Sequence, residues 1–307
     1  MARLHIYGGD RHGEDLFRDL AHIRLMMGRR RMLGWMSGAA SFALLGACGS
    51  DSDSPPVTVP TPGPAPTPAP TATPTPTPTA TSGPTPICGP TPSETRGPYP
   101  ADGTNASSGS TNNILAATGI VRSDIRPSLA GSGTVAAGVP LTLTITLVNA
   151  SASCAPLAGY AIYVWHADAL GRFSLYTAPG ETYLRGVQQA DADGHVTFTT
   201  IVPGCLAGRY PHIHVALFAS LAGATDGANA QLVSQLIVPE PVCTAVYADT
   251  ATYAGSAANF GAVSVATDTV FGDNNAVQNA ARTLEVTGSA GAGYAAQVTL
   301  AIAAGGA

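Results

Sequence analysis

Charged residues are scarce in this 307-residue chain. They make up 11% of it, lysine is absent, and the net charge is −5. A nucleic-acid surface needs clustered basic side chains, so this composition argues against a nucleic-acid partner. The low content of lysine and glutamate, together with abundant threonine, valine, alanine and glycine, favours strands and turns over helices.

Apolar runs long enough to cross a membrane are also missing. Met32–Ala47 is apolar but shorter than the roughly 20 residues of a membrane span. It follows Arg29–Arg31 and ends in LGAC at Cys48, which is the order of a signal peptide. The last four residues resemble a bacterial lipobox, and the arginines resemble a twin-arginine signal. We expect residues 1–47 to be removed and Cys48 to be lipidated, although an ordinary signal peptide with an incidental cysteine is the alternative.

This signal predicts an extracytoplasmic lipoprotein, held at the membrane by a lipid anchor in the bacterial periplasm or on the cell surface. Residues 48–86 alternate threonine and proline over much of their length. Because proline fixes φ and lacks an amide proton, this segment favours an extended polyproline II stalk without a core. Residues 87–307 then remain as one folded domain.

Cysteine is rare, and no C-x-x-C pair is present, which argues against the cysteines as zinc ligands. Four cysteines fall within the predicted domain: Cys88, Cys154, Cys205 and Cys243. An even number in an exported domain predicts two disulfides. Three pairings are possible. We favour Cys88 with Cys154 and Cys205 with Cys243, because each bond then ties a loop to a neighbouring element.

Helical periodicity is missing over any long stretch, whereas period-two alternation recurs. In Leu141–Asn149, leucine, isoleucine and valine alternate with threonine and asparagine, which indicates a half-buried strand. The predicted strands are Ile114–Arg122, Leu141–Asn149, Tyr160–Ala167, Val196–Ile201, His212–Phe218, Leu232–Val238, Gln278–Val286 and Tyr294–Ile302. Many short strands separated by turn residues predict an all-β fold, an Ig-like or prealbumin-like β-sandwich with extended loops.

Chemistry-bearing residues concentrate in the segment RYPHIHV, residues 209–215. In a strand, His212 and His214 project from the same face, and Ile213 packs into the opposite one. Two imidazoles placed side by side make a ready pair of metal ligands. A His-x-His pattern alone is more often a surface or core pair, so its surroundings decide the interpretation.

Those surroundings contain five segments that share an order and spacing: Thr91–Tyr99, Val164–Gly171, Tyr183–Gln188, Asp193–Gly204 and Arg209–His214. Together they resemble the intradiol ring-cleavage dioxygenases, most closely the exported branch of that family. The resemblance covers most of residues 88–250, and the set is far more specific than any one member.

The resemblance implies a non-haem iron enzyme. In the family, two tyrosines and two histidines hold ferric iron (Fe3+), which binds a small aromatic diol of the catechol type. O2 is then inserted between the two hydroxyl-bearing carbons, and no organic cofactor is required. Carried over to this chain, His212 and His214 match the histidine ligands. Arg209 matches the arginine that stabilises charge on the ring, and Gln235 matches a polar residue beside the site.

Both tyrosine ligands are missing from their expected places. Gly171-Arg172-Phe173-Ser174 has phenylalanine where the family has its first tyrosine, and Leu206 stands where it has the second. Neither side chain can bind iron. Substitute ligands are Tyr176 and Tyr210, with Tyr99 after a Gly-Pro pair that runs near the active site in the family.

Carboxylates offer another way to complete the site. Asp168, Asp191 or Asp193 would make a two-histidine, one-carboxylate centre suited to ferrous iron or zinc. The remaining histidines of this region, His166 and His195, are expected to face solvent or lie in turns, and Trp165 is expected in the core.

Two functions therefore stand side by side. The favoured one is a dioxygenase of the intradiol type with an altered metal shell, supported by Arg209, His212 and His214. The alternative is a catalytically inactive β-sandwich lipoprotein that serves as a binding or surface module, supported by Phe173 and Leu206.

Overall fold

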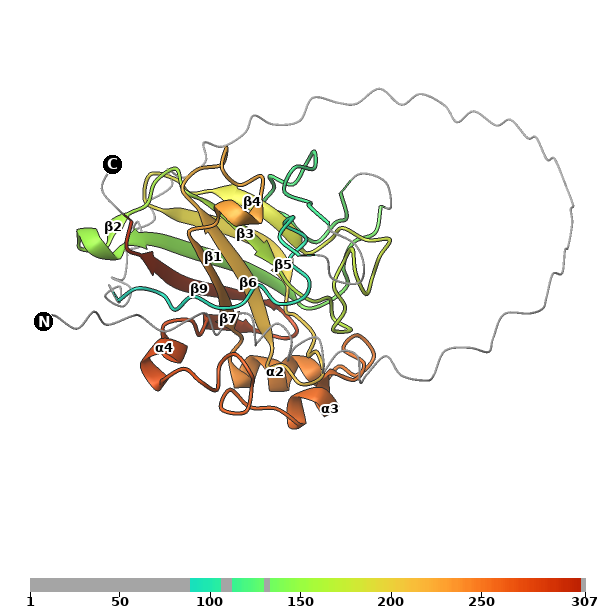
Figure 1. Ribbon diagram of the computed structural model, residues 1–307. Helices are drawn as coiled ribbons and strands as arrows, with labels where there is room; N and C mark the ends of the chain where they lie inside the picture. The colour runs from blue at the N-terminus through green and yellow to red at the C-terminus, as the bar shows by residue number, and fades with distance from the viewer. Residues whose placement is uncertain (1–88, 106–111, 130–132, 305–307) are drawn as a thin grey trace, which may run out of the picture. The chain divides into compact units, whose positions relative to one another are not determined.

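Two β-sheets pack face to face in the computed structural model, which describes residues 89–105, 112–129 and 133–304 (Figure 1). The first sheet has the order β2-β1-β9-β8, with β5 also paired to β1, and the second has the order β4-β3-β6-β7. The prediction of an all-β sandwich is confirmed. The predicted signal peptide and stalk, with Cys48, lie outside the described residues.

The strands are β1 (Pro140–Asn149), β2 (Ala155–Pro156), β3 (Ala161–Trp165), β4 (Arg185–Gln189), β5 (His195–Ile201), β6 (His212–Phe218), β7 (Leu232–Ile237), β8 (Glu285–Ser289) and β9 (Gly293–Ile302). The helices α2 (Glu240–Tyr247), α3 (Ser256–Gly261) and α4 (Ala276–Ala280) are short and lie below the strands in Figure 1. Within the described ranges, no helix has the length and apolar character needed to span a membrane.

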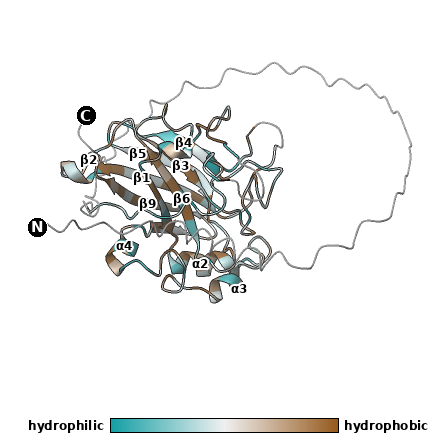
Figure 2. Cartoon of the chain, in the orientation of Figure 1, coloured by the Kyte–Doolittle hydropathy of each residue, from teal (hydrophilic) through white to brown (hydrophobic). Residues whose placement is uncertain are grey.

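Period-two alternation builds the layer between the sheets. In β1, Leu141, Leu143, Ile145 and Leu147 are buried in the main core, whereas the threonines between them are more exposed. A fully buried leucine or isoleucine contributes roughly 1.5–3 kcal/mol, so these side chains determine which face of the strand turns inward. Brown, the hydrophobic colour, is accordingly frequent along the strands in Figure 2.

The second sheet is buried on both faces. Every residue of β3 and β6 is buried. Ile213, Val215 and Leu217 of β6 pack into the main core, and Ala216 and Phe218 pack into a second cluster on the outer face. Segments from elsewhere in the chain contribute to that second cluster. His212 and His214, on the same side of β6 as Ala216, therefore lie beneath a covering layer and not on an open surface.

Two predicted strands differ from the structure. Ile114–Arg122 forms turns, with one isolated bridge from Val121 to Val187, so the prediction of a strand there is wrong. Gln278–Val286 contains the end of α4 and only the start of β8. A capping box between Asn275 and Gln278 satisfies the first amides of α4 and favours a helix over a strand.

The predicted disulfide between Cys205 and Cys243 is wrong, because both are buried free thiols. The Cys205 thiol is directed at the carbonyl oxygen of Arg209 at 3.5 Å, and the Cys243 thiol at that of Val238 at 3.7 Å. Burial raises the pKa of the Cys205 thiol to about 12. Cys154 is disulfide-bonded; Cys88 lies outside the described residues, so their pairing stays a prediction.

Candidate functional site

A row of four side chains crosses the outer face of the second sheet. Arg185 on β4 is paired with Trp165 on β3, Trp165 with His214 on β6, and His214 with Gln235 on β7. The Trp165 and His214 rings stack with centroids 4.8 Å apart and an interplanar angle of 6°. Trp165 is fully buried, as expected, so it provides a fixed surface that orients the His214 imidazole.

The two histidines converge on one point. Their Nε2 atoms are 3.0 Å apart. His212 Nδ1 lies 2.6 Å from the carbonyl oxygen of Tyr210, and because a carbonyl only accepts, Nδ1 carries the proton. The Nε2 lone pair of His212 then faces His214 Nε2, from which it can accept a hydrogen bond or with which it can bind a metal ion. His214 Nδ1 is buried without a hydrogen-bond partner.

This separation fits a shared metal ion. Two imidazole nitrogens each about 2.1 Å from one ion, at a right angle to each other, lie about 3.0 Å apart. The described residues contain no group of three or more His, Cys, Asp or Glu side chains placed to hold a metal. The imidazoles therefore fit a metal ion as two neutral donors. They do not reproduce the two-tyrosinate, two-histidine set that ferric iron would require.

Both imidazoles are in the form that binds metals. Burial lowers the pKa of His212 far below its usual range, and the positive charge of Arg209 lowers it further. Burial lowers the pKa of His214 as well, with His212 and Arg209 adding to the effect. Both rings are therefore neutral at pH 7 and present lone pairs.

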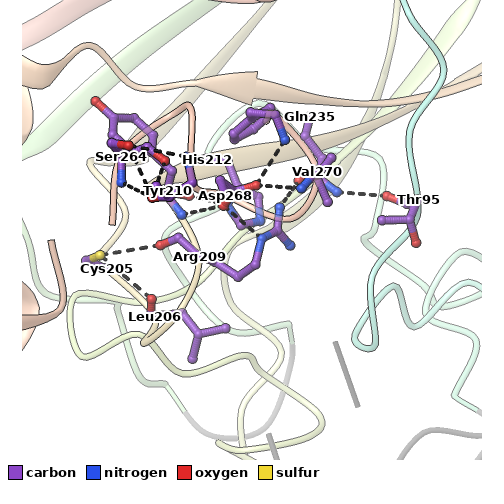
Figure 3. A network of polar contacts seen from close by, with 12 residues as sticks. Thr95, Cys205, Leu206, Arg209, Tyr210, His212, Gln235, Ser264, Asp268 and Val270 are labelled. Carbon is purple, nitrogen blue, oxygen red and sulfur yellow. Dashed lines mark hydrogen bonds and ion pairs between the residues drawn. The ribbon is translucent and has the colours of Figure 1, made fainter. Parts of the chain in front are cut away.

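Beside His212 stands a set of hydrogen-bonded side chains that we call the polar wall: Arg209, Gln235 and Asp268 (Figure 3). Arg209 Nη2 donates to Gln235 Oε1 at 2.6 Å, and Gln235 Nε2 donates to the carbonyl oxygen of Thr95 at 2.9 Å. Arg209 Nε donates to Asp268 Oδ2 at 3.0 Å. Arg209 and Gln235 thus lie beside the histidine pair.

Asp268 is the member of the site that sequence reasoning missed. Its carboxylate also accepts from the backbone amides of Tyr210 at 2.6 Å, Val270 at 2.8 Å and Phe271 at 3.1 Å. Burial alone would raise its pKa, but the charge of Arg209 and the Tyr210 amide outweigh that effect and lower it. A single aspartate in a turn, 59 residues beyond Arg209, carries no local signal of such a role.

A second set of side chains beside the histidine pair is apolar. We call it the apolar wall and define it as Tyr99, Phe173 and Leu206. Phe173 meets His214 edge to face, with centroids 6.1 Å apart. Tyr99 packs against Phe173 at 4.9 Å, and Leu206, half-buried, packs against the same cluster. The position where the resemblance calls for the first tyrosine thus borders His214, and it carries an apolar ring.

The substitute tyrosines direct their hydroxyl groups elsewhere. The Tyr176 hydroxyl accepts from the Ala101 amide at 3.0 Å. The Tyr210 ring packs against Phe260 at 5.5 Å, and it is the backbone carbonyl of Tyr210, not its hydroxyl, that reaches His212. Burial raises the pKa of both phenols, which disfavours the phenolate form that a metal binds.

The three candidate aspartates are engaged or exposed in other places. Asp168 accepts from the Tyr183 hydroxyl at 2.8 Å and from Arg172 at 2.9 Å. Asp191 and Asp193 are exposed in the turn before β5, where Asp191 accepts the amide of Asp193. The described contacts of these carboxylates hold turns together and do not involve the histidine pair.

His166 differs from its expected place. It is buried, and its Nε2 lies 2.7 Å from Thr200 Oγ1. Burial lowers the pKa of His166 to about 4, so it is a neutral core histidine. His195 is exposed at the start of β5, as expected.

A glycine brings the chain close over His214. Gly97 adopts a positive φ of 66°, and a Cβ placed there would lie 3.1 Å from His214 Cε1. Thr95 Oγ1 accepts the Gly97 amide, and Thr95 also binds Gln235. The segment that the resemblance placed near the active site therefore lies against the imidazole, and there is little room for a side chain.

Comparisons with known proteins agree with the fold of this domain. A family model described as "Dioxygenase" matches residues 116–225. The intradiol ring-cleavage dioxygenase from Tetranychus urticae superposes with a TM-score of 0.50 at 21% identity, over 70% of this chain and 95% of that one. A second solved dioxygenase gives 0.53 at 21% identity over the same shares.

The dioxygenase domain of a carbohydrate-binding fusion protein from Streptomyces sp. SirexAA-E is also similar, at 24% identity over 70% of this chain and 98% of that one, with a TM-score of 0.42. No curated protein sequence matches the chain. At these identities, the two structures with TM-scores of 0.50 and 0.53 show the fold of the domain and no more.

Proposed function

We propose that this chain is an intradiol-type dioxygenase that cleaves a catechol-type aromatic diol with O2; the family model that matches residues 116–225 and the fold shared with a solved intradiol ring-cleavage dioxygenase support this. The proposed site is a metal ion held by His212 and His214. The observation that carries the proposal is the approach of the two Nε2 atoms to 3.0 Å inside a buried layer.

Each residue of the site has a part in this proposal. The bound metal would supply a centre that takes up the diol oxygens and makes the ring electron-rich enough to react with O2. His212 is oriented for binding by its bond to the Tyr210 carbonyl, and His214 by its stack on Trp165. Arg209 brings a positive charge beside the site, where it stabilises negative charge on the ring, and Gln235 holds Arg209 in place.

The metal shell would differ from that of a four-ligand ferric centre. Two neutral imidazoles offset none of the charge of a trivalent ion, and Phe173 and Leu206 add no anionic donor. We therefore propose weak ferric binding, without the strong visible band that tyrosinate-to-iron charge transfer produces. Any turnover would proceed at a metal ion of lower charge.

A second function is favoured by the apolar wall. With Phe173 against His214 and Leu206 on the same cluster, the site has aromatic and aliphatic side chains in place of ligands. Such a surface suits the binding of an aromatic molecule without its conversion. In this alternative, the chain is an inactive binding or surface module.

Three measurements on the mature protein purified from membranes distinguish the two functions. They are metal analysis, a visible absorption spectrum and oxygen uptake with catechol. We expect substoichiometric iron, no strong band, and oxygen uptake that rises when ferrous iron is added. His212→Ala should abolish metal-dependent uptake, while His195→Ala, an exposed control, should not. Binding of catechol without uptake under every metal condition would favour the binding module. A full equivalent of iron with the strong band would show that the tyrosine positions are misplaced.

We also propose that the protein acts outside the cytoplasm, anchored through Cys48. The support is the order of basic, apolar and small residues before that cysteine. Cys48→Ala should release the protein from the membrane fraction. A variant that stays in washed membranes would contradict the lipid anchor.

A further inference from the structure

The histidine pair lies beside a positive charge. Arg209 is buried, and its guanidinium donates to Gln235, the cross-strand neighbour of His214 on β7. A guanidinium beside the pair repels a metal cation held between the two imidazoles, by Coulomb's law. A cation site at this point therefore needs a compensating negative charge.

Asp268 is placed to provide that compensation. Its Oδ2 is 3.0 Å from Arg209 Nε and 2.6 Å from the amide nitrogen of Tyr210, whose carbonyl oxygen binds His212 Nδ1, and the carboxylate is buried. Ion pairs buried away from water are screened little, so the effect reaches the adjacent imidazole. Together, Arg209 and Asp268 form a pair that is close to neutral.

The turn that carries Asp268 also shapes the site. Phe271 meets His212 edge to face at 6.1 Å and lies 6.0 Å from the Arg209 guanidinium. Two backbone amides of this turn, those of Val270 and Phe271, bind the Asp268 carboxylate and fix its position. The turn lies beyond residues 116–225, the part of the chain that matches the family model.

We propose that Asp268 enables the His212–His214 site to take a divalent transition-metal cation, by cancelling from outside the ligand shell the positive charge of Arg209. The inference rests on the proposed function and deepens it, since it names the charge class of the metal and the residue that sets its affinity. Asp268 is a positioning residue in this role, because it acts through Arg209 and His212.

Cobalt(II) titration of the metal-free mature protein tests the idea, with binding followed by calorimetry and by the visible absorption of the bound ion. We expect Asp268→Asn to weaken cobalt binding about 10- to 100-fold, the usual range for a group that supports a ligand. Arg209→Gln should strengthen binding, because it removes the repulsion and leaves the carboxylate. The double variant should fall between the two single variants.

The opposite changes in cobalt affinity expected for Asp268→Asn and Arg209→Gln distinguish an electrostatic role of Asp268 from a purely structural one. If Asp268 only held the turn together, both single variants would weaken binding and lower the thermal midpoint. Asp249→Asn is the matched control, because Asp249 also accepts backbone amides in a turn but is exposed; cobalt affinity should not change. If Asp268→Asn fails to fold, the gain expected for Arg209→Gln still decides the matter.

Several results would overturn the inference: no cobalt binding by the wild-type protein, unchanged affinity in Asp268→Asn, or weaker binding in Arg209→Gln. Oxygen uptake with catechol, measured on the same samples, reports separately on the proposed function. Affinities in the expected order without uptake would defeat the enzyme and leave the inference standing. Oxygen uptake that is the same in Asp268→Asn and in the wild type would support the enzyme and contradict the inference.

Discussion

The polar wall and the apolar wall border the same pair of histidines but are built on different principles. In the polar wall, Arg209, Gln235 and Asp268 are joined by hydrogen bonds of 2.6–3.0 Å. In the apolar wall, Phe173 and Leu206 contribute packing alone. The orientation of His212 and His214 is therefore secured by the sheet, Trp165 and a backbone carbonyl, and it does not require the anionic ligands.

The largest effect is expected from Arg185, which holds the covering layer on the apolar side. Its guanidinium donates to the carbonyl oxygens of Tyr99, Pro100 and Ser174, to Ser174 Oγ and to the Tyr163 hydroxyl. Arg185→Met would leave these buried acceptors without donors, which costs on the order of 4 kcal/mol or more of unfolding free energy.

Urea denaturation measures this loss. Arg126→Met is the control, because Arg126 pairs with Asp124 in a part-exposed salt bridge, where removal costs about 0–1 kcal/mol. If the two variants lose similar stability, the apolar wall is held by packing and not by Arg185.

The second-largest effect is expected on iron binding, when tyrosine ligands are introduced into the apolar wall. The double variant Phe173→Tyr, Leu206→Tyr should change ferric binding from weak to stoichiometric, because each tyrosinate brings a negative charge. The visible band and faster catechol cleavage should appear with it. Absorption spectroscopy and oxygen uptake are the measurements.

Phe260→Tyr adds a phenol that is remote from the pair and serves as the control, since Phe260 packs on Tyr210 and Tyr247. A double variant that gains neither iron nor colour would mean that these two positions do not face the metal. The lack of ligands in the apolar wall would then not explain weak iron binding.

The third effect concerns pH. His166 has a pKa of about 4 in the folded protein, below its value of 6.5 in the unfolded chain, so the unfolded state binds more protons in this range. Its contribution to stability is complete above pH 6.5 and is lost as pH falls towards 4, by roughly 2.5 kcal/mol at pH 4.5. The buried His212 and His214 act in the same direction.

Unfolding free energy measured from pH 7 to pH 4.5 isolates this contribution when His166→Gln is compared with the wild type. The variant should lose less stability on acidification, while the exposed His195→Gln should follow the wild type. Parallel pH profiles for wild type and His166→Gln would show that His166 is not held neutral by the fold.

The smallest expected effect concerns the reactivity of two buried thiols, one of which, Cys205, lies between the polar wall and the apolar wall. Cys205 adjoins Leu206, and its thiol points at the Arg209 carbonyl. Because burial raises the pKa of the Cys205 and Cys243 thiols, we expect slow labelling by a maleimide in the folded protein and two free thiols per chain after denaturation. No free thiol under denaturing, non-reducing conditions would restore the predicted disulfide.

Local pattern allowed much of the fold to be predicted. Alternation in Leu141–Asn149 and Tyr294–Ile302 predicted β1 and β9 closely, and His212–Phe218 matches β6 at both ends. Ile114–Arg122 has apolar residues but forms turns that cover the outer face, because its partners are chosen by packing and not by its own periodicity. Gln278–Val286 was mistaken because a cap at Asn275 outweighs strand propensity.

By itself, the sequence determined that His212 and His214 share a face, since residues two apart in a strand always do. It also determined that Phe173 and Leu206 bring no donor atoms to the site. Only the tertiary structure decided that the imidazoles are neutral, that Asp268 reaches Arg209 from 59 residues away, and that Cys205 and Cys243 stay apart. Desolvation and long-range approach depend on how distant segments pack, and no local pattern encodes them.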